Sequence, residues 1–315
     1  MSVAADAAQL IANVERVIVG KREPIELVVT VLLSGGHVLL QDVPGVGKTM
    51  LARALARSIG GEAARIQCTP DLLPQDITGS SVVDQRSLEL RFIPGPIFAN
   101  VVLVDEINRA TPRTQAAFLE PLDEGQVTVD GRTHLLPAPF FLLATLNPAE
   151  HHGIYPLPEG QLDRFMLATS LGYPGFEDEL QMLGSHVARH PIDDLAPVFT
   201  PEAVVTLARE VRAVFVSEAV RRYALQIIAR TRTAPGVLLG CSPRAGIALL
   251  RAAQARAAMA GRTFVLPDDI KALAVPVLAH RMLVRSEAGP AAGIIRILLE
   301  EVAVPPSLDA GRARP

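Results

Sequence analysis

The segment Leu39–Leu51 constrains the fold of this chain more than any other part of the sequence. Its sequence, LLQDVPGVGKTML, begins with an apolar run that predicts a strand. It continues into a short glycine-containing loop and ends in a stretch that predicts a helix starting at Lys48. Loop N–H groups followed by a helix N-terminus attract phosphate oxygens. The segment therefore predicts a phosphate-binding loop within an α/β fold.

Individual residues of this loop have distinct expected roles. We expect Lys48 to reach the β- and γ-phosphates of a nucleotide and Thr49 to ligate Mg²⁺. Lysine occurs only at positions 21, 48 and 271 among 30 basic residues, so its presence here is informative. The usual motif has glycine at position 42, where this chain has aspartate, but the following Pro-Gly still favours a tight loop. The residues predicted to contact the nucleotide are Asp42, Val43, Pro44, Gly45, Val46, Gly47, Lys48, Thr49 and Met50.

Two further apolar runs end in polar residues that suit the same chemistry. Residues 101–106 have the sequence VVLVDE, a strand that delivers Asp105 and Glu106 to its carboxyl end, where open α/β sheets place their sites. We expect Asp105 to hold Mg²⁺ through water and Glu106 to polarise the attacking water. Asn147 follows a third such run and can hydrogen-bond that water or the γ-phosphate. A simple turn asparagine before Pro148 remains the alternative.

The first half of the chain alternates apolar runs with helical stretches, which predicts a parallel sheet covered by helices on both faces. The Asp130-Gly131 dipeptide between QVTV and THLL predicts a tight hairpin. A second, inserted hairpin is expected within residues 75–98. The predicted strands of the sheet are His37–Gln41, Arg65–Cys68, Asn100–Asp105, Phe140–Leu146 and Phe165–Leu171.

The second half of the chain has a different pattern. Strand-like runs stop near Pro191, alanine- and arginine-rich stretches recur at helical spacing, and prolines mark several helix starts. We therefore expect an α/β domain over residues 1–190 and a smaller all-α domain over residues 191–315, which a chain of 315 residues accommodates. The predicted helices of the second domain are Pro201–Phe215, Glu218–Arg232, Pro243–Ala260 and Pro267–Leu278.

Composition excludes several classes of protein. Hydrophobic residues make up 49% and charged residues 20% of the chain, which excludes a disordered or fibrous protein. The net charge of −3 argues against nucleic acid as a partner, and no apolar run is long enough for a membrane span. Cys68 and Cys241 lie far apart, which excludes a disulfide framework and favours a cytoplasmic setting. The adjacent His151 and His152 are expected to be loop residues in solvent rather than zinc ligands.

Taken together, these motifs resemble the MoxR group of AAA+ ATPases. The resemblance extends over residues 14–285, and its motifs DEINRA, YPLPEGQLDRF and SPRA are specific to that group. Further segments that resemble it are GHVLLQDVPGVGKT, CTPDLLPQDITGS and VLPDDIKALAVPVLAHRM. The resemblance implies a three-layer P-loop α/β domain with a parallel sheet, a smaller all-α lid domain after it, and assembly into rings.

The resemblance also assigns roles to single residues. Lys48 and Thr49 resemble the Walker A residues, which bind phosphate and Mg²⁺. Asp105 and Glu106 resemble the Walker B pair, and Asn147 resembles the residue called sensor 1.

Two arginines and one N-terminal segment take their expected roles from the resemblance alone. Arg164, in QLDRF, resembles the arginine finger that enters the neighbouring subunit's site. Arg244, in SPRA, resembles the sensor 2 arginine, which we expect to close over the nucleotide of its own chain. Val19 and Gly20 resemble the segment that flanks adenine. No transferred catalytic residue is affected by the chain's departures from the group, which are Asp42, Leu119–Glu124 and Leu146.

The function implied is Mg²⁺-dependent ATP hydrolysis in the cytoplasm, coupled to remodelling or maturation of client proteins. The resemblance further implies a homo-oligomeric, hexameric ring, metalloenzymes as clients, and a partner protein with a von Willebrand factor A domain. The alternatives are the motor subunit of a metal chelatase, a nucleic-acid-associated motor, and a non-catalytic nucleotide-binding scaffold. The net charge of −3 argues against the nucleic-acid motor, and the intact Asp105-Glu106 pair argues against the scaffold. Arg109 and Arg113 either face a neighbour or cap local structure.

Overall fold

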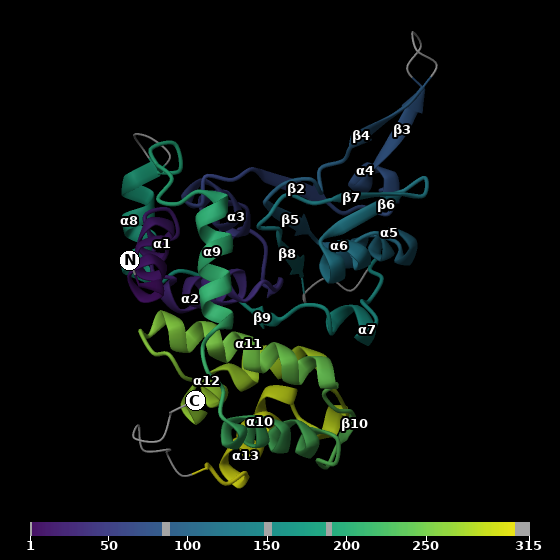
Figure 1. The fold of residues 1–315 in the computed structure, drawn as a ribbon. Coiled ribbons are helices and arrows are strands. Elements are labelled where there is room, and N and C mark those ends of the chain that lie inside the picture. The colour runs from purple at the N-terminus through teal and green to yellow at the C-terminus, as the bar shows by residue number, and fades with distance from the viewer. Residues whose placement is uncertain (1, 84–88, 148–152, 187–190, 306–315) are drawn as a thin grey trace.

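The computed structural model describes residues 2–83, 89–147, 153–186 and 191–305. Figure 1 shows an α/β part built around a central sheet and, below it, a mainly helical part formed by the C-terminal helices. His151 and His152, which the sequence predicts to be loop residues, lie outside the described residues.

The α/β part contains a five-stranded parallel sheet with the strand order β2-β5-β8-β1-β9. All five strands predicted from apolar runs are present. Because the strands are parallel, their carboxyl ends meet at one edge of the sheet, where polar residues follow β5 and β8. The strands are β1 (Val38–Gln41), β2 (Ala63–Gln67), β5 (Val101–Asp105), β8 (Phe141–Leu146) and β9 (Leu167–Thr169).

Alternate residues of the sheet pack into two separate hydrophobic cores, which gives this part its three layers. Val38 and Leu40 pack with apolar residues of α1, α2 and α3, whereas Leu39 packs with Phe118 and Leu122 on the opposite face. Successive side chains of a strand point to opposite faces, so a run that is apolar at every position needs helices on both sides. The covering helices are α1 (Val3–Glu15), α2 (Arg22–Ser34) and α3 (Lys48–Ser58) on one face, and α5 (Pro112–Ala116) and α6 (Leu119–Glu124) on the other.

Two antiparallel hairpins extend from the α/β part (Figure 1). The antiparallel pair β3–β4 matches the hairpin predicted within residues 75–98, and residues 84–88 between the two strands lie outside the described residues. Asp130 and Gly131 join β6 to β7 with φ angles of 50° and 73°. Positive φ at both central residues is the geometry of the two-residue turn that the dipeptide predicted. The elements are α4 (Pro74–Thr78), β3 (Gly79–Val83), β4 (Leu90–Pro94), β6 (Gln126–Val129) and β7 (Arg132–Leu135).

The C-terminal part is a helical lid, as predicted. The side chains of Thr200, Ser217 and Ser242 each accept a hydrogen bond from the backbone N–H three residues later, which begins a helix at each position. Proline follows two of these caps at the first helical position, where its missing N–H costs little. The helices are α9 (Pro201–Arg212), α10 (Glu218–Thr231), α11 (Pro243–Met259), α12 (Pro267–Leu278) and α13 (Ala291–Glu301).

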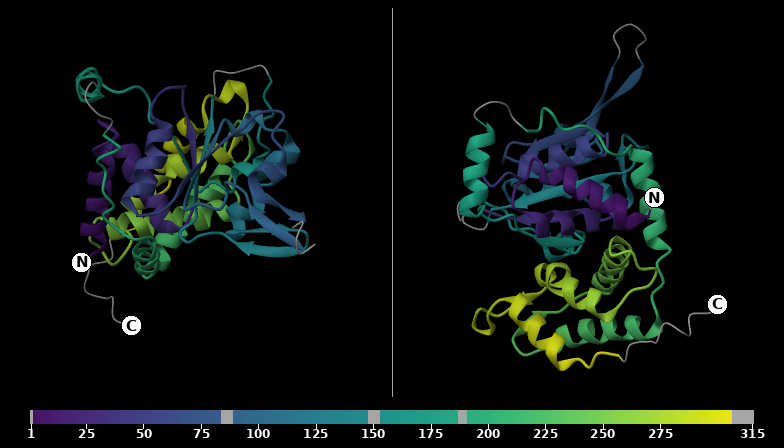
Figure 2. Two further views of the ribbon diagram at one scale, coloured as in Figure 1. Left: turned by 90° about the horizontal axis from the view of Figure 1, so that it is seen from above. Right: turned by 90° about the vertical axis from the view of Figure 1, so that its left-hand side faces the viewer.

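Two features of this part were not predicted. β10 (Val237–Leu239) and β11 (Leu283–Val284) form a small antiparallel ladder, and strands this short leave no periodic signal in the sequence. Helix α9 packs against α2 as well as α11, so it connects the two parts along one side of the molecule (Figure 2). The domain boundary at residue 190 stays a prediction, because the helix that follows it contacts both parts.

The remaining helices are α7 (Glu159–Leu162) and α8 (Phe176–His186). Within the described ranges, no helix has the length and apolar character that a membrane crossing requires.

Candidate functional site

The loop between β1 and α3 has the backbone geometry of an anion-binding turn. Gly45 and Gly47 have φ angles of 84° and 92°, which side-chain-bearing residues rarely adopt. Gly47 is the N-cap of α3 and has no side chain with which to satisfy the first N–H groups of the helix. The first turn of α3 also contains no acidic residue. These N–H groups and the positive end of the helix dipole are therefore available to a phosphate.

A cavity of about 340 Å³ opens beside this loop, and we call it the β1–α3 pocket. It brings together residues from the loop and from the carboxyl ends of β2, β5 and β8. The predicted site residues that line it are Pro44, Gly45, Gly47, Lys48, Thr49, Met50, Asp105, Glu106 and Asn147. Arg65 and Gln67 of β2 also line it, and the sequence analysis did not identify either one. The predicted phosphate-binding loop and the two predicted acidic residues thus share one cavity.

Lys48 lies at the start of α3 with its ammonium group over the loop. Its Nζ donates hydrogen bonds of 3.3 Å to the backbone carbonyls of Asp42 and Val43. These carbonyls orient a positive charge at the mouth of the β1–α3 pocket, where it complements an anionic ligand.

Asp42 has a role in the fold that explains its departure from the usual motif. Its side chain is 4% exposed, and its carboxylate accepts hydrogen bonds from the backbone N–H groups of Leu171 (2.5 Å) and Gly172 (3.0 Å). Its own N–H donates to the carbonyl of Leu146. Asp42 therefore ties the end of β1 to β8 and to the segment after β9. We expect it to contribute only backbone to a nucleotide site.

Asp105 and Glu106 are both anchored by Thr145 of β8. The fully buried Thr145 hydroxyl donates to Oδ1 of Asp105 and accepts from the backbone N–H of Glu106, each at 2.8 Å. The other carboxylate oxygen of Asp105 lies 2.7 Å from Nη2 of Arg65. Thr145 was missed in the sequence analysis, although a hydroxyl inside the apolar run FLLATL is the signal that identifies it.

Glu106 occupies an unusual backbone conformation at the end of β5. Its φ of 54° lies in the left-handed region, which costs a non-glycine residue about 1–3 kcal/mol. Its Oε2 accepts hydrogen bonds from Nε2 of Gln67 (3.0 Å) and from Nη1 of Arg109 (3.1 Å). The strained turn and these two donors hold the carboxylate in the pocket. Arg109 therefore contacts the site of its own chain, whereas Arg113 is exposed.

Cys68, next to this pair, reports the local electrostatic field. Burial is the main cause that raises the pKa of its thiol, and with the negative charges of Asp105 and Glu106 the pKa reaches about 12. The thiol is therefore neutral at physiological pH and is not a nucleophile. The negative charges of Asp105 and Glu106, which contribute to this shift, also attract a cation such as a divalent metal.

Val19 and Gly20, the predicted adenine-flanking residues, follow α1 and lie close to the loop. The preceding Ile18 brings its Cδ1 to 3.8 Å from the point where a Cβ on Gly47 would lie. Gly20 has a φ of 71°, and a Cβ there would collide with the carboxylate of Asp178. The segment is therefore held between the loop and the first turn of α8.

Arg164 and Arg244 lie together, and neither lines the β1–α3 pocket. Nε of Arg164 is 2.8 Å from Oδ2 of Asp123, and Nη2 of Arg244 is 2.5 Å from Oδ1 of the same carboxylate. The structure thus brings Arg244 to Arg164 rather than to Lys48. This placement differs from the expectation that Arg244 closes over the nucleotide of its own chain. The orientation of the lid, which no local motif specifies, accounts for the difference.

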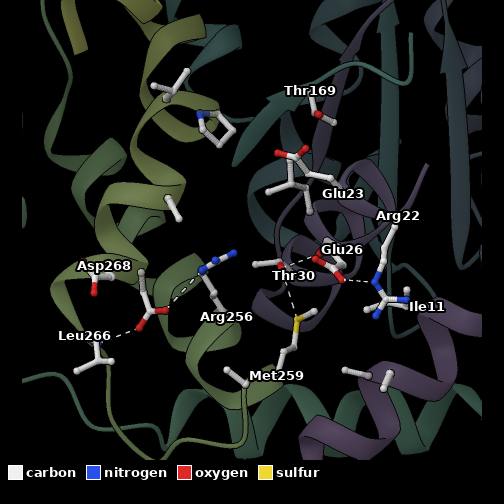
Figure 3. A pocket seen from close by; sticks show the side chains of 18 of the residues that line it. Ile11, Arg22, Glu23, Glu26, Thr30, Thr169, Arg256, Met259, Leu266 and Asp268 are labelled. Atoms are coloured by element: carbon white, nitrogen blue, oxygen red, sulfur yellow. Dashed lines mark hydrogen bonds and ion pairs between the residues drawn. The ribbon is translucent and has the colours of Figure 1, made fainter. Parts of the chain in front are cut away.

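A second, larger cleft is lined by residues of α1 and α2 and of the lid helices α11 and α12 (Figure 3). Its volume is about 940 Å³, and it contains none of the predicted site residues. Several of its charged side chains pair with each other, as Arg22 does with Glu26 (2.9 Å) and Arg256 with Asp269 (3.6 Å). This cleft therefore gives no support to a second site for the predicted chemistry.

Comparison with known proteins agrees with this arrangement. Residues 37–167 match the family model described as "ATPase family associated with various cellular activities (AAA)", and residues 229–296 match the model of the AAA lid domain. The chain is 38% identical to Chaperone MoxR1 of Mycobacterium tuberculosis over 88% of its own length and 76% of that protein. This chain belongs to the MoxR family of AAA+ ATPases. It is therefore a nucleotide-binding, ATP-hydrolysing enzyme.

Other relatives of this MoxR-family chain extend over nearly its whole length. It is 50% identical to the uncharacterized protein YeaC of Bacillus subtilis, over 94% of this chain and 93% of that one. A crystal structure of a putative ATPase from Cytophaga hutchinsonii superposes with a TM-score of 0.89 at 34% identity and covers 96% of both chains. The predicted α/β domain with a helical lid is therefore confirmed.

Proposed function

We propose that this chain hydrolyses ATP with Mg²⁺ at a site completed by a neighbouring subunit, and that it uses the energy to remodel client proteins. The observation that carries the proposal is the β1–α3 pocket, where Lys48, Thr49, Asp105, Glu106 and Asn147 meet. These residues provide the groups that phosphoryl transfer requires: a phosphate cradle, oxygen ligands and a base.

The donor set of the pocket fits a magnesium ion. Mg²⁺ prefers oxygen ligands and is usually held by one or two protein groups together with substrate phosphates. Thr49 supplies a hydroxyl and Asp105 a carboxylate, and both oxygens of Asp105 already have protein partners. This favours contact between Asp105 and the ion through water. When bound, Mg²⁺ neutralises charge that develops on the phosphate oxygens.

The protein groups then have separate tasks. The loop N–H groups and Lys48 bind and orient the β- and γ-phosphates. Glu106, held by Gln67 and Arg109, accepts a proton from the attacking water. Asn147, which is 6% exposed at the end of β8, orients that water or the γ-phosphate.

Replacing Lys48 with alanine is expected to weaken ATP binding by about 10- to 100-fold. Hydrogen bonds to a charged partner contribute about 1.5–3 kcal/mol each, and the variant loses the charged donor that faces the phosphates. Isothermal titration with Mg-ATP measures the change, and Lys271→Ala, in lid helix α12, is the matched control. Equal affinity of Lys48→Ala and wild type would show that this loop does not bind the nucleotide.

The positions of Arg164 and Arg244 support a site that is shared between subunits. Both arginines pair with Asp123 and neither lines the pocket of its own chain. An arginine that stabilises charge on a γ-phosphate must therefore reach the pocket of another copy. A head-to-tail contact repeated by rotation closes into a ring, and we propose a hexamer. Both arginines would then act in trans.

Helix α8 also supports assembly. Phe176 is 80% exposed and Leu183 is 66% exposed, and with Leu180 they form a stripe at helical spacing. Large apolar side chains gathered on one exposed face are typical of a protein–protein contact. Asp178, which approaches Gly20, lies on the opposite face of α8, so the apolar stripe points away from that segment.

Assembly into a ring is expected to depend on ATP. A nucleotide between two subunits adds contacts to both, so binding and assembly stabilise each other. Light scattering coupled to gel filtration at micromolar concentration is expected to report hexamers with ATP and smaller species without it. Lys48→Ala is expected to stay in the smaller form with ATP present. A wild-type chain that remains monomeric with saturating Mg-ATP contradicts the ring.

The proposed client activity follows the relative named Chaperone MoxR1. We propose cytoplasmic clients that include metalloenzymes, together with a partner that carries a von Willebrand factor A domain. A Glu106→Gln variant is expected to retain clients because it binds ATP without releasing them. Recovery of such proteins by this variant, but not by Lys48→Ala, tests the proposal. Recovery of chelatase subunits, or stimulation of turnover by DNA, would favour the corresponding alternative motor.

A further inference from the structure

Asp123 uses both carboxylate oxygens to bind arginines from two different parts of the molecule. Oδ2 lies 2.8 Å from Nε of Arg164, which follows α7 in the α/β part. Oδ1 lies 2.5 Å from Nη2 of Arg244, which lies in the first turn of lid helix α11. The Asp123 side chain is only 24% exposed. One carboxylate on α6 therefore sets the separation of two guanidinium groups that lie far apart in the sequence.

The two arginines keep donor groups that these contacts do not use. Arg164 gives Nε to Asp123 and Nη1 to the carbonyl of Gly160, and Arg244 gives Nη2 to Asp123. A guanidinium carries five N–H donors in a rigid plane, so each arginine retains N–H groups that point elsewhere. Two positive charges and one negative charge leave the cluster positive. Such a cluster suits a phosphate rather than a neutral ligand.

The lid and the α/β part are also held together by contacts of Asp163, which precedes Arg164 in the chain. The carboxylate of Asp163 accepts a hydrogen bond of 2.8 Å from the hydroxyl of Ser242 and lies 3.0 Å from Nε of Arg281. These contacts do not involve Asp123. Removal of the Asp123 charge is therefore expected to loosen the two arginines without detaching the lid.

We infer that Asp123 is a positioning residue for hydrolysis, which holds Arg164 and Arg244 in the arrangement that enters the neighbouring subunit's nucleotide site. The inference rests on the proposed supply of both arginines in trans. A misplacement of about 1 Å in a positioned group can cost about 10²-fold in rate, and a side chain fixed in advance loses less freedom on binding. Asp123 itself does not line the β1–α3 pocket of its own chain.

Replacing Asp123 with asparagine is expected to lower kcat by about 10- to 100-fold while the KM for ATP changes little. The amide has the same size but does not pair with two guanidinium groups. Asp123→Glu keeps the negative charge on a side chain that is longer by one methylene group, and it is expected to lose less activity. Glu124→Gln, on the same helix and hydrogen-bonded to Gln126, is the matched control and is expected to keep wild-type turnover.

Mixing of variants distinguishes a positioning role from a structural one. Asp123→Asn subunits have an intact loop but loosened arginines, and Lys48→Ala subunits have the opposite defect. Their mixture is expected to regain hydrolysis where an intact loop meets a correctly held arginine pair. A local folding defect in Asp123→Asn subunits would not be repaired by a neighbour. If asparagine lowers the yield of folded protein, Asp123→Glu serves in the same mixture.

The outcomes separate this inference from the proposed function. If mixing restores Arg164→Ala but not Asp123→Asn, Asp123 acts within its own chain and the inference is wrong while the shared site stands. Unchanged or increased turnover in Asp123→Asn also overturns it, because the carboxylate would then be dispensable or inhibitory. If Arg164→Ala is not restored, the shared site itself is wrong and the inference falls with it.

Discussion

A Glu106→Gln variant is expected to bind ATP with near wild-type affinity and to hydrolyse it about 10²–10⁴-fold more slowly, the usual contribution of a general base. The amide preserves the size of the side chain and still accepts hydrogen bonds from Gln67 and Arg109, which contact Oε2 of the native carboxylate. It does not accept a proton from the attacking water. Binding and chemistry are therefore expected to separate in this variant.

Phosphate release and bound nucleotide, measured on the same sample, test this expectation. Glu62→Gln removes an exposed carboxylate immediately before β2 and is the matched control. Turnover of Glu106→Gln close to that of wild type would mean that another group activates the water. The strained backbone at Glu106 would then need a different explanation.

Arg164→Ala and Arg244→Ala are each expected to lower turnover by about 10³–10⁵-fold, the range of an arginine that stabilises charge on a transferring phosphoryl group. Neither arginine lines the pocket of its own chain, so the affinity of isolated subunits for ATP is expected to stay unchanged. If Arg244 instead closed over the nucleotide of its own chain, its loss would weaken ATP binding even at protein concentrations too low for rings to form. Titration at low protein concentration, with turnover measured at high concentration, distinguishes the two cases.

Arg222→Ala is the control for the arginine variants. Arg222 is 75% exposed on α10 and pairs with Glu218 one helical turn away. Exposed pairs of this kind contribute little to stability, so this variant is expected to behave as wild type. A comparable loss of turnover in Arg222→Ala would indicate a general effect of removing arginines from the lid.

The sheet and the loop were predictable because local sequence determines them. Apolar runs such as Val101–Val104 have to be buried on both faces, and Gly47 is at the position where only glycine adopts the required φ without strain. Residues that reach the pocket only because two strands pair with each other were not predictable from local sequence. Arg65 and Gln67 reach the pocket because β2 pairs with β5, and that pairing depends on contacts distant in the sequence.

The largest difference between expectation and structure concerns the lid. The SPRA motif predicts an arginine at the start of a helix, and Arg244 lies in the first turn of α11. The motif does not specify where the helix lies. The contacts of Asp163 with Ser242 and Arg281, about 80–120 positions apart, contribute to that placement, as does the packing of α11 against α1 and α2. The role of Asp42 was also not predictable from the local motif, because its hydrogen-bond partners Leu171 and Gly172 follow β9 and are distant in the sequence.

Hydrolysis by mixed rings shows directly whether each nucleotide site is completed by the neighbouring subunit. Arg164→Ala subunits and Lys48→Ala subunits, each inactive alone, are combined after subunit exchange has been verified by fluorescence transfer between labelled chains. An intact loop then meets an intact arginine in about a quarter of the sites of a ring with two equally abundant subunits. Sites shared between subunits are expected to restore turnover in this mixture and also in the mixture of Arg244→Ala with Lys48→Ala. Verified exchange without restored turnover in the Arg164→Ala mixture would show that Arg164 does not complete a neighbour's site.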